Sequence, residues 1–450
     1  MSFDRESLAL LDEALAVLAD GFRHLPDVPQ TLGVAQLREP LLAAAHRLQD
    51  NAPYHHPLYV GHMQKPPHPV ARLAYTLTLW LNPNNHAYDG GRASSIMEQE
   101  AIGEIARMVG WPDSQGHLCG GGTLANFEAL WVAREQHPGK AIAASSQAHY
   151  THERLSGVLG VPFRSIATDA RGRMDASALE DALRDGTIGT VVVTLGTTAT
   201  GAVDPLERIL ALRARHTFRI HVDAAYGGYF TLADNLDADT RQAFDCLAQA
   251  DSLAIDPHKH GLQPYGCGCV LFRDPAVRHH YRHDSPYTYL SSDDPHLGEI
   301  SLECSRPGAA AVALWATQRL LPLVPGGAFA QDLAAGRMAA LALHRALVGD
   351  ARFAPLFPPP LDIVVWAVRA DIASQASLRA RALHAAAREH DLHLALVTLP
   401  RAMLEACTPV RTWDTDTLTC LRACVMKPEH REWMDEILAR LDAAAALVIR

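Results

Sequence analysis

Short apolar runs recur along the middle of the chain, with stretches of helical pattern between most of them. Runs of this kind, rich in β-branched residues and bounded by turn residues, are typical of strands buried in a parallel sheet. The expected strands are 140–145, 190–194, 220–223, 252–255 and 268–272. This alternation predicts an α/β domain built on a mainly parallel sheet. Ligands of such sheets bind beyond the strand ends, so a site is expected there.

Charged side chains stand at the ends of two of these predicted strands. Lys259 follows the strand at 252–255, and Asp223 ends the strand at 220–223. A lysine flanked by histidines and glycines at a strand end is poorly placed to be a solvated surface charge. It is well placed to be a desolvated nucleophile or Schiff-base former, although a surface loop is the alternative for His-Lys-His taken alone. An aspartate and a lysine at two strand ends are what pyridoxal phosphate requires, because the lysine holds its aldehyde and the carboxylate keeps its ring nitrogen protonated.

A glycine run precedes a predicted helix and offers a place for a phosphate. Gly120, Gly121 and Gly122 are followed by Thr123, and residues 127–135 have a helical pattern without Gly or Pro. A glycine-rich turn that opens a helix exposes free backbone N–H groups beside the positive end of the helix dipole, which suits a phosphate. Thr123 adds a hydroxyl donor. A tight turn without a ligand is the alternative, since a glycine run alone is weak evidence.

The composition excludes several classes of protein. The 450 residues carry a formal net charge of −10, which argues against a nucleic-acid-binding surface and shows no polybasic membrane patch. No apolar run approaches the ~20 residues that a membrane span needs, and the first residues lack the pattern of a signal peptide. The 8 cysteines show neither a disulfide framework nor zinc spacing, so we expect reduced thiols in a cytoplasmic protein.

Four stretches occur in an order that resembles a known enzyme family. They are Gly-Gly-Thr-Leu-Ala-Asn at 121–126, Ala-His-Tyr-Thr at 148–151, Val-Asp-Ala-Ala-Tyr at 222–226 and Asp-Pro-His-Lys at 256–259. The chain resembles the group II pyridoxal-phosphate-dependent amino-acid decarboxylases, and most of all their bacterial and archaeal tyrosine and glutamate decarboxylase branches. The resemblance covers roughly residues 55–325 and, more weakly, the C-terminal part. It departs from the family pattern at Gly120, where Ser or Thr is usual.

The resemblance implies a fold and an assembly. The fold would be that of aspartate aminotransferase (fold type I), an α/β architecture with a mainly parallel seven-stranded sheet in a large domain and a smaller C-terminal α/β domain. The expected divisions are an N-terminal helical segment at 1–55, a cofactor-binding domain at 56–325 and a small domain at 326–450. The apolar stripe from Leu8 to Phe22 predicts a helix that packs on a partner subunit or, as the alternative, on its own subunit. We expect a homodimer with active sites at the subunit interface.

The resemblance also assigns residues around the cofactor, pyridoxal 5'-phosphate. Lys259 would bind the aldehyde and Asp223 the ring nitrogen. His149 would stack on the ring, with His152 as the competing candidate. The expected cofactor contacts are Gly121, Gly122, Thr123, His149, Thr198, Asp223, Ala225, His258 and Lys259.

The substrate would be held by residues from loops outside the predicted strands. His62 and Asn85 lie in segments that resemble the family's substrate mouth. Arg306 would hold the α-carboxylate in a bidentate pair, with a buried structural ion pair as the alternative. Tyr287 and Tyr289 are both candidates for the acid that protonates the intermediate after CO₂ leaves.

These parts together predict α-decarboxylation of a small-molecule substrate, an L-amino acid, to an amine and CO₂. The Asn-Pro-Asn-Asn sequence at 82–85 resembles the tyrosine branch and favours an aromatic substrate, whereas Ser-Arg-Pro at 305–307 resembles the glutamate branch and leaves an acidic one open. An aminotransferase, a carbon–carbon lyase or a decarboxylating oxidative deaminase could use the same lysine, aspartate and phosphate cradle. A non-enzymatic regulator is disfavoured, because no DNA-binding module is appended.

Overall fold

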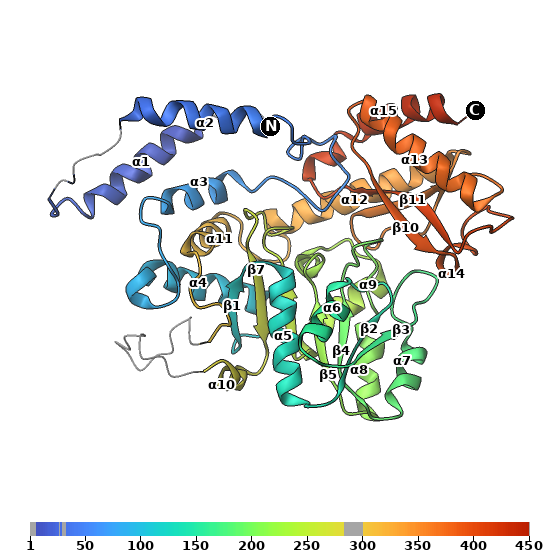
Figure 1. The fold of residues 1–450 in the computed structure, drawn as a ribbon, viewed down its shortest axis with the longest axis horizontal. Coiled ribbons are helices and arrows are strands. Elements are labelled where there is room, and N and C mark those ends of the chain that lie inside the picture. The colour runs from blue at the N-terminus through green and yellow to red at the C-terminus, as the bar shows by residue number, and fades with distance from the viewer. Residues whose placement is uncertain (1–5, 27, 29–32, 283–299, 450) are drawn as a thin grey trace.

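The computed structural model describes residues 6–26, 28, 33–282 and 300–449, and its larger part is built on a seven-stranded sheet (Figure 1). The strands lie in the order β1-β7-β6-β5-β4-β2-β3. Strand β7 runs antiparallel to β1 and β6, and the other neighbouring pairs are parallel. The bounds are β1 (Gln115–Cys119), β2 (Ala141–Ser145), β3 (Phe163–Ile166), β4 (Ile188–Thr194), β5 (Arg219–Asp223), β6 (Ser252–Ile255) and β7 (Gly268–Phe272). The mainly parallel sheet predicted from the apolar runs is therefore confirmed.

Two strands of this sheet, β1 and β3, are not predicted by the apolar runs. Strand β1 reads Gln-Gly-His-Leu-Cys, and its Gly116 lies so close to β7 that a Cβ there would stand 2.4 Å from the Leu271 side chain. Strand β3 lies at the edge of the sheet and includes the polar pair Arg164 and Ser165. A strand with few apolar residues gives little periodic signal, so tertiary packing decides both cases.

Both faces of the large sheet are covered, as strand β4 shows. Val191 and Val193 join the main hydrophobic core, whereas Val192 between them packs with Leu130 and Leu155 on the other face. Successive side chains of a strand point to opposite faces, so a run of valines requires helices on both sides. The helices of this part are α4 (Tyr88–Met108), α5 (Gly122–Gln136), α6 (Thr151–Val158), α7 (Ala176–Leu183), α8 (Leu206–Ala211), α9 (Ala238–Asp245), α10 (Arg278–Tyr281) and α11 (Gly308–Leu320).

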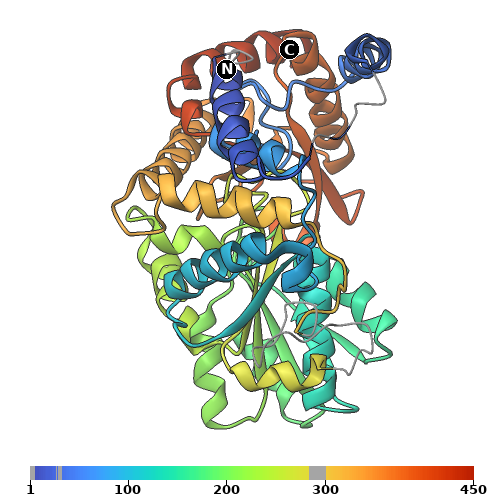
Figure 2. The same ribbon diagram turned by 90° about the vertical axis from the view of Figure 1, so that its left-hand side faces the viewer.

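The C-terminal part forms a second, antiparallel sheet of four strands in the order β10-β11-β9-β8. In Figure 2 this part, coloured orange to red, lies above the green strands of the large sheet. Its strands are β8 (Phe353–Pro355), β9 (Ile363–Val368), β10 (Ala395–Pro400) and β11 (Thr417–Cys424), and its helices are α12 (Ala328–Gly349), α13 (Ala373–Glu389), α14 (Arg401–Leu404) and α15 (Met434–Val448). The amide of Val60 donates to His393 and the amide of Cys424 donates to Val60, so a segment near residue 60 also joins this sheet. The proposed division at residues 55 and 325 stays a prediction.

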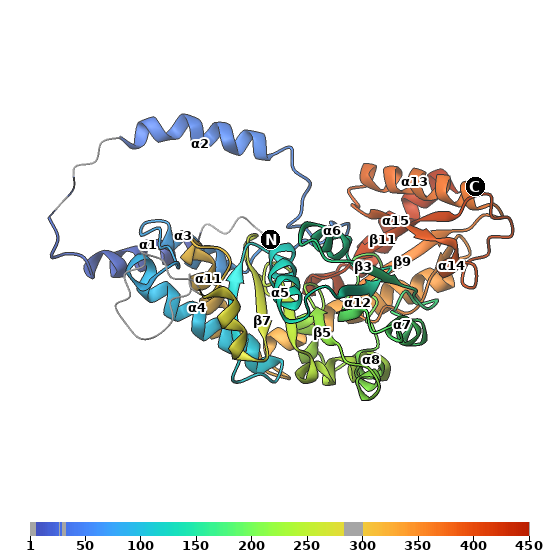
Figure 3. The ribbon, with the colours of Figure 1, turned by 60° about the horizontal axis from the view of Figure 1, so that its bottom comes forward.

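Three helices precede the large sheet: α1 (Ser7–Asp20), α2 (Val34–Leu48) and α3 (Pro69–Thr78). Helix α1 lies beside α3, whereas α2 stands apart from the other described helices and strands and has no buried residue (Figure 3). The helix expected from Leu8 to Phe22 is thus present. Within the described ranges, no helix is long and apolar enough to cross a membrane.

Candidate active site

A cavity of about 510 Å³ opens at the carboxyl ends of the parallel strands. Its lining includes Thr194 and Asp223, the last residues of β4 and β5, and Asp256, which follows β6. The amino end of α5 lies against the same space. The structure brings together all nine residues expected around a cofactor: Gly121, Gly122, Thr123, His149, Thr198, Asp223, Ala225, His258 and Lys259.

Lys259 is the amine of this cavity, and it faces a buried carboxylate. Its Nζ lies 3.0 Å from Asp256 Oδ2, and the Asp256 side chain is 3% exposed. The other oxygen, Asp256 Oδ1, has no hydrogen-bond partner among the described residues. Gly122 must be a glycine at this point, because a Cβ there would stand 2.6 Å from Asp256 Oδ2. Sequence reasoning missed Asp256, although its position in Asp-Pro-His-Lys was the available signal.

Asp223 stands at the end of β5 and is held by two donors. His152 Nε2 lies 2.8 Å from Asp223 Oδ2, and the amide of Ala225 donates to Oδ1 at 3.1 Å. Burial by itself would raise the pKa of Asp223. The hydrogen bond and charge of His152, together with Lys259 and the Ala225 amide, outweigh burial and hold that pKa below its usual value. Asp223 therefore stays a carboxylate at neutral pH.

The two histidines considered for the ring-stacking position are placed differently. His149 lines the cavity, whereas His152 is fully buried behind Asp223. His149 Nδ1 lies 2.8 Å from Thr151 Oγ1 and accepts from the Thr151 amide at 3.3 Å. An accepting Nδ1 places the ring proton of neutral His149 on Nε2. Burial, opposed by the charge of Asp223, lowers the pKa of His149, which favours that neutral form.

The amino end of α5 presents backbone N–H groups at the edge of the cavity. The first N–H groups of a helix have no partner within it, and they lie at the positive end of its dipole. Gly121 precedes the helix with φ of 140°, a conformation that favours glycine. Gly268 of β7 packs against it so closely that a Cβ there would stand 2.5 Å from Gly121 Cα. Tight glycine packing thus fixes the turn that presents these donors.

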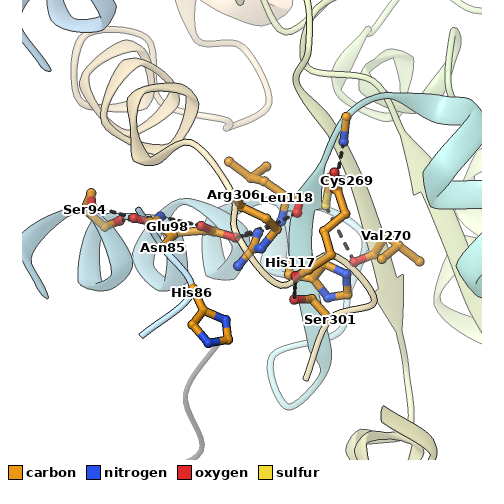
Figure 4. Close-up of polar contacts among 12 residues, drawn as sticks. Asn85, His86, Ser94, Glu98, His117, Leu118, Cys269, Val270, Ser301 and Arg306 are labelled. Carbon is orange, nitrogen blue, oxygen red and sulfur yellow. Dashed lines mark hydrogen bonds and ion pairs between the residues drawn. The ribbon is translucent and has the colours of Figure 1, made fainter. Parts of the chain in front are cut away.

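Arg306 and Asn85 lie together in a second cluster, which does not line the cavity (Figure 4). Arg306 Nη1 donates to Glu98 Oε1 and to the Leu118 carbonyl, each at 2.6 Å. Asn85 Nδ2 donates to the second oxygen of Glu98, also at 2.6 Å. Nε and Nη2 of Arg306 are buried without partners among the described residues. The structure therefore places Arg306 in a buried ion pair, and its contact with a substrate carboxylate stays a prediction.

The remaining expected site residues are His62, Tyr287 and Tyr289. His62 is exposed and is not part of its lining. Tyr287 and Tyr289 lie outside the described residues. Sequence reasoning also missed Arg422 of β11, whose Nη1 donates to the Thr198 carbonyl at 2.8 Å and so ties the smaller sheet to the cavity wall. An arginine within an apolar run was the signal available for it in the sequence.

The arrangement fits pyridoxal phosphate in three separate respects. The cofactor needs an amine for its aldehyde, a carboxylate for its ring nitrogen and anion donors for its phosphate. Lys259, Asp223 and the amino end of α5 offer these three groups around one cavity. In addition, Thr194 Oγ1 lies in the wall, buried and without a partner in the part of the chain that is described, as expected where a polar ligand belongs.

Comparison with known sequences places these residues in a family. A family model described as the pyridoxal-dependent decarboxylase conserved domain matches residues 54–326. The chain is 28% identical over 366 residues to an L-tyrosine decarboxylase of Levilactobacillus brevis, with 59% of this chain and 58% of that protein aligned. It is 36% identical over 258 residues to a probable L-aspartate decarboxylase of Halobacterium salinarum, covering 55% of this chain and 69% of that protein. The chain thus spans less than two thirds of the length of the tyrosine decarboxylase.

Solved structures show the same fold at low sequence identity. The apo form of mouse CSAD matches with a TM-score of 0.79 and 21% identity, over 98% of this chain and 92% of that chain. Oryza sativa TDC with PLP and tryptamine matches with a TM-score of 0.76 and 18% identity, over 98% of this chain and 99% of that chain. Together with the mostly parallel seven-stranded sheet, these matches establish fold type I.

Proposed function

The chain belongs to the pyridoxal-dependent decarboxylase family, and we propose that it removes the α-carboxylate of an L-amino acid as CO₂ and releases the amine. The observation that carries the proposal is that Lys259, Asp223 and the amino end of α5 surround one cavity. Pyridoxal phosphate supplies an electron-accepting ring that stabilises the charge left on Cα when a bond there breaks. The activity of the whole protein is thus inferred from the site and the family together.

Each part of the cavity would hold one part of the cofactor. Lys259 Nζ would hold the aldehyde, with Asp256 as its carboxylate partner in the free site. Asp223 would keep the ring nitrogen protonated, because its negative charge is fixed by His152. Gly121, Gly122 and Thr123 would bind the phosphate, since backbone N–H groups and a hydroxyl converge at the start of α5.

Two residues would decide which bond of the substrate breaks. His149 would restrict the orientation of the substrate, because its ring lies in the cavity wall and is fixed at Nδ1 by Thr151. Arg306 has Nη1 engaged by Glu98 and Leu118, which leaves Nε and Nη2 for a carboxylate. The bond at Cα that stands perpendicular to the cofactor ring is the one that breaks. By holding the carboxylate in that position, these residues would select decarboxylation over removal of a proton.

A tyrosine-like amino acid is the substrate class we favour. The Levilactobacillus brevis relative and a relative from Enterococcus faecium are both named L-tyrosine decarboxylase. An acidic amino acid is the alternative, supported by the probable L-aspartate decarboxylase of Halobacterium salinarum. Aromatic and acidic side chains differ in charge, so a direct comparison of substrates separates the two classes.

The test is release of CO₂ from a panel of amino acids labelled at the carboxyl carbon. We expect labelled CO₂ and amine in equal amounts with no keto acid, and the highest kcat/KM for an aromatic substrate. Aspartate or glutamate as the best substrate would replace the aromatic class by the acidic one. A keto acid formed with the carboxyl carbon retained would contradict decarboxylation and indicate transamination.

The variants His149→Ala and Arg306→Lys belong in the same assay. Both should release less CO₂, by about tenfold or more, because orientation contributes several kcal/mol to a barrier. His149→Ala should also give a larger share of side products. A lysine at position 306 keeps the charge but loses the planar fork, of which Nη1 contacts Glu98 and Leu118. Unchanged product ratios in His149→Ala would contradict its orienting role.

We also propose that the chain acts as a homodimer, which the exposed face of α2 supports. Val34, Leu37, Leu41 and Leu48 recur at helical spacing along this helix, and all four are exposed. An apolar stripe on a helix with no buried residue among the described parts of its own chain is typical of an interface. A second copy of this chain is the partner we expect to cover it.

Mass measurement in solution tests the dimer. We expect the wild type at twice the 48.9 kDa of one chain, and the double variant Leu37→Glu/Leu41→Glu shifted towards the monomer. The matched control is Leu378→Glu, which alters an equally exposed leucine on α13. A monomeric wild type at working concentration would contradict the proposal.

A cytoplasmic location remains part of the proposal. All eight cysteines lie in the described part of the chain and are unpaired. Burial raises the pKa of the Cys267 and Cys269 thiols, so they are unreactive side chains of the core. Cysteines that form no disulfide bonds are typical of proteins in a reducing compartment.

A further inference from the structure

Asp362 joins the smaller sheet to the two segments that carry the cavity's charged groups. It lies directly before β9, and the Val425 amide at the end of β11 donates to its carbonyl. Its side chain leaves the sheet and is 1% exposed. The Tyr226 hydroxyl donates to Asp362 Oδ1 at 2.6 Å, across 136 positions of the chain. On the other side, His260 Nε2 lies 3.3 Å from Asp362 Oδ2, a contact short of a well-aligned hydrogen bond.

Both partners of Asp362 are close to the cavity in the chain. Tyr226 lines the cavity and follows Asp223 by three residues, and His260 is the residue after Lys259. The His260 ring stands edge-on against Tyr226, with centroids 4.7 Å apart, and against Phe230 at 5.0 Å. The Asp362 carboxylate is therefore hydrogen-bonded to the segment after β5 through Tyr226, and it contacts the segment after β6 through His260.

Burial changes the pKa values of both Asp362 and His260. Burial raises the pKa of Asp362 to about 6, opposed by the Tyr226 hydrogen bond and the charge of Lys65. Burial also lowers the pKa of His260, so the imidazole is neutral and Lys65 is the cation that acts on the carboxylate. Burying a carboxylate with so few hydrogen-bond partners costs free energy.

We propose that Asp362 is a positioning residue that, through Tyr226 and His260, sets the place of Lys259 relative to Asp223. The inference rests on the proposed function, because it concerns the amine that would hold the cofactor. It makes the geometry of the cavity depend on the smaller sheet. A shift of about 1 Å at a reacting group can lower a rate by about a hundredfold, so the contact matters even though Asp362 touches no substrate.

The test compares Asp362→Asn and Tyr226→Phe with the wild type as holoenzyme. An asparagine keeps the acceptor for Tyr226 but removes the negative charge that faces His260. The phenylalanine removes only the hydroxyl and keeps the ring that packs on His260. The matched control is Asp371→Asn, an exposed aspartate beyond the other end of β9.

The main readout is the pH midpoint at which the visible absorption of the lysine-bound cofactor changes. We expect both variants to shift this midpoint downward, by about one unit for Asp362→Asn, because the protonated nitrogen at Lys259 is held less well. Turnover should fall about tenfold with little change in KM, and Asp371→Asn should match the wild type.

Two results would overturn the inference. If both variants kept the wild-type midpoint and kcat and lost only thermal stability, Asp362 would be a structural residue. If Asp362→Asn did not fold, Tyr226→Phe would decide in the same way. A wild type that formed no visible cofactor band would instead overturn the cofactor assignment, and the positioning role with it.

Discussion

Lys259→Ala should abolish covalent attachment of the cofactor and lower turnover on the order of a thousandfold or more. The chain has four lysines, and Lys259 is the one that lines the cavity. Two of the others are engaged elsewhere, because the amines of Lys65 and Lys427 donate to the carbonyls of Met426 and Tyr59. Reduction of the wild type with borohydride should therefore fix the cofactor to a single peptide.

The alanine also leaves Asp256 buried without its ammonium partner, which could weaken the fold rather than the chemistry. Lys259→Arg separates the two effects, because a guanidinium keeps a positive charge near Asp256 but does not condense with an aldehyde. We expect Lys259→Arg to be as inactive as Lys259→Ala and more stable. The control is Lys140→Ala, which should keep activity. Recovery of the reduced adduct at position 140, 65 or 427 would contradict the assignment of Lys259.

The expected site residues that the structure brings to one cavity are those whose position follows from local pattern. Lys259 and Asp223 both stand at the ends of apolar runs, and parallel strands bring their carboxyl ends to one edge of a sheet. The signal from the glycines before α5 is also local, because the glycine turn and the start of the helix are adjacent in the chain. These features needed no knowledge of distant contacts.

The contacts that the sequence does not reveal join distant segments of the chain. The Arg306 guanidinium was expected to bind a substrate carboxylate, but Glu98, 208 positions away, engages its Nη1. Asp362 stands in an apolar segment, and nothing local connects it to Tyr226 or His260. Strands β1 and β3 were not predicted for a related reason. They have few apolar residues, and they form through pairing with β7 and β2. Local pattern therefore predicted which residues surround the cavity, whereas the contacts behind them depend on the tertiary structure.

Asp223→Asn should leave the fold nearly intact and lower turnover on the order of 10³- to 10⁴-fold, the scale seen when a buried charge behind a catalytic nitrogen is removed. An asparagine can still accept from the Ala225 amide, as Asp223 Oδ1 does at 3.1 Å. Its amide nitrogen would face His152 Nε2, and His152 could then accept there by moving its proton to Nδ1, which has no partner among the described residues. The substitution thus removes a charge with little change of shape.

The size of the effect follows from the charge of Asp223. His152, Lys259 and the Ala225 amide outweigh burial and hold the pKa of Asp223 below its usual value, so the carboxylate is lost only as the pH falls well below neutral. The wild type should show no titration of Asp223 between pH 5 and 9. The measurement is turnover together with the cofactor absorption spectrum. The control is His152→Gln, which keeps the carboxylate and should lose far less activity. Wild-type turnover in Asp223→Asn with cofactor bound would show that Asp223 is not the partner of the ring nitrogen.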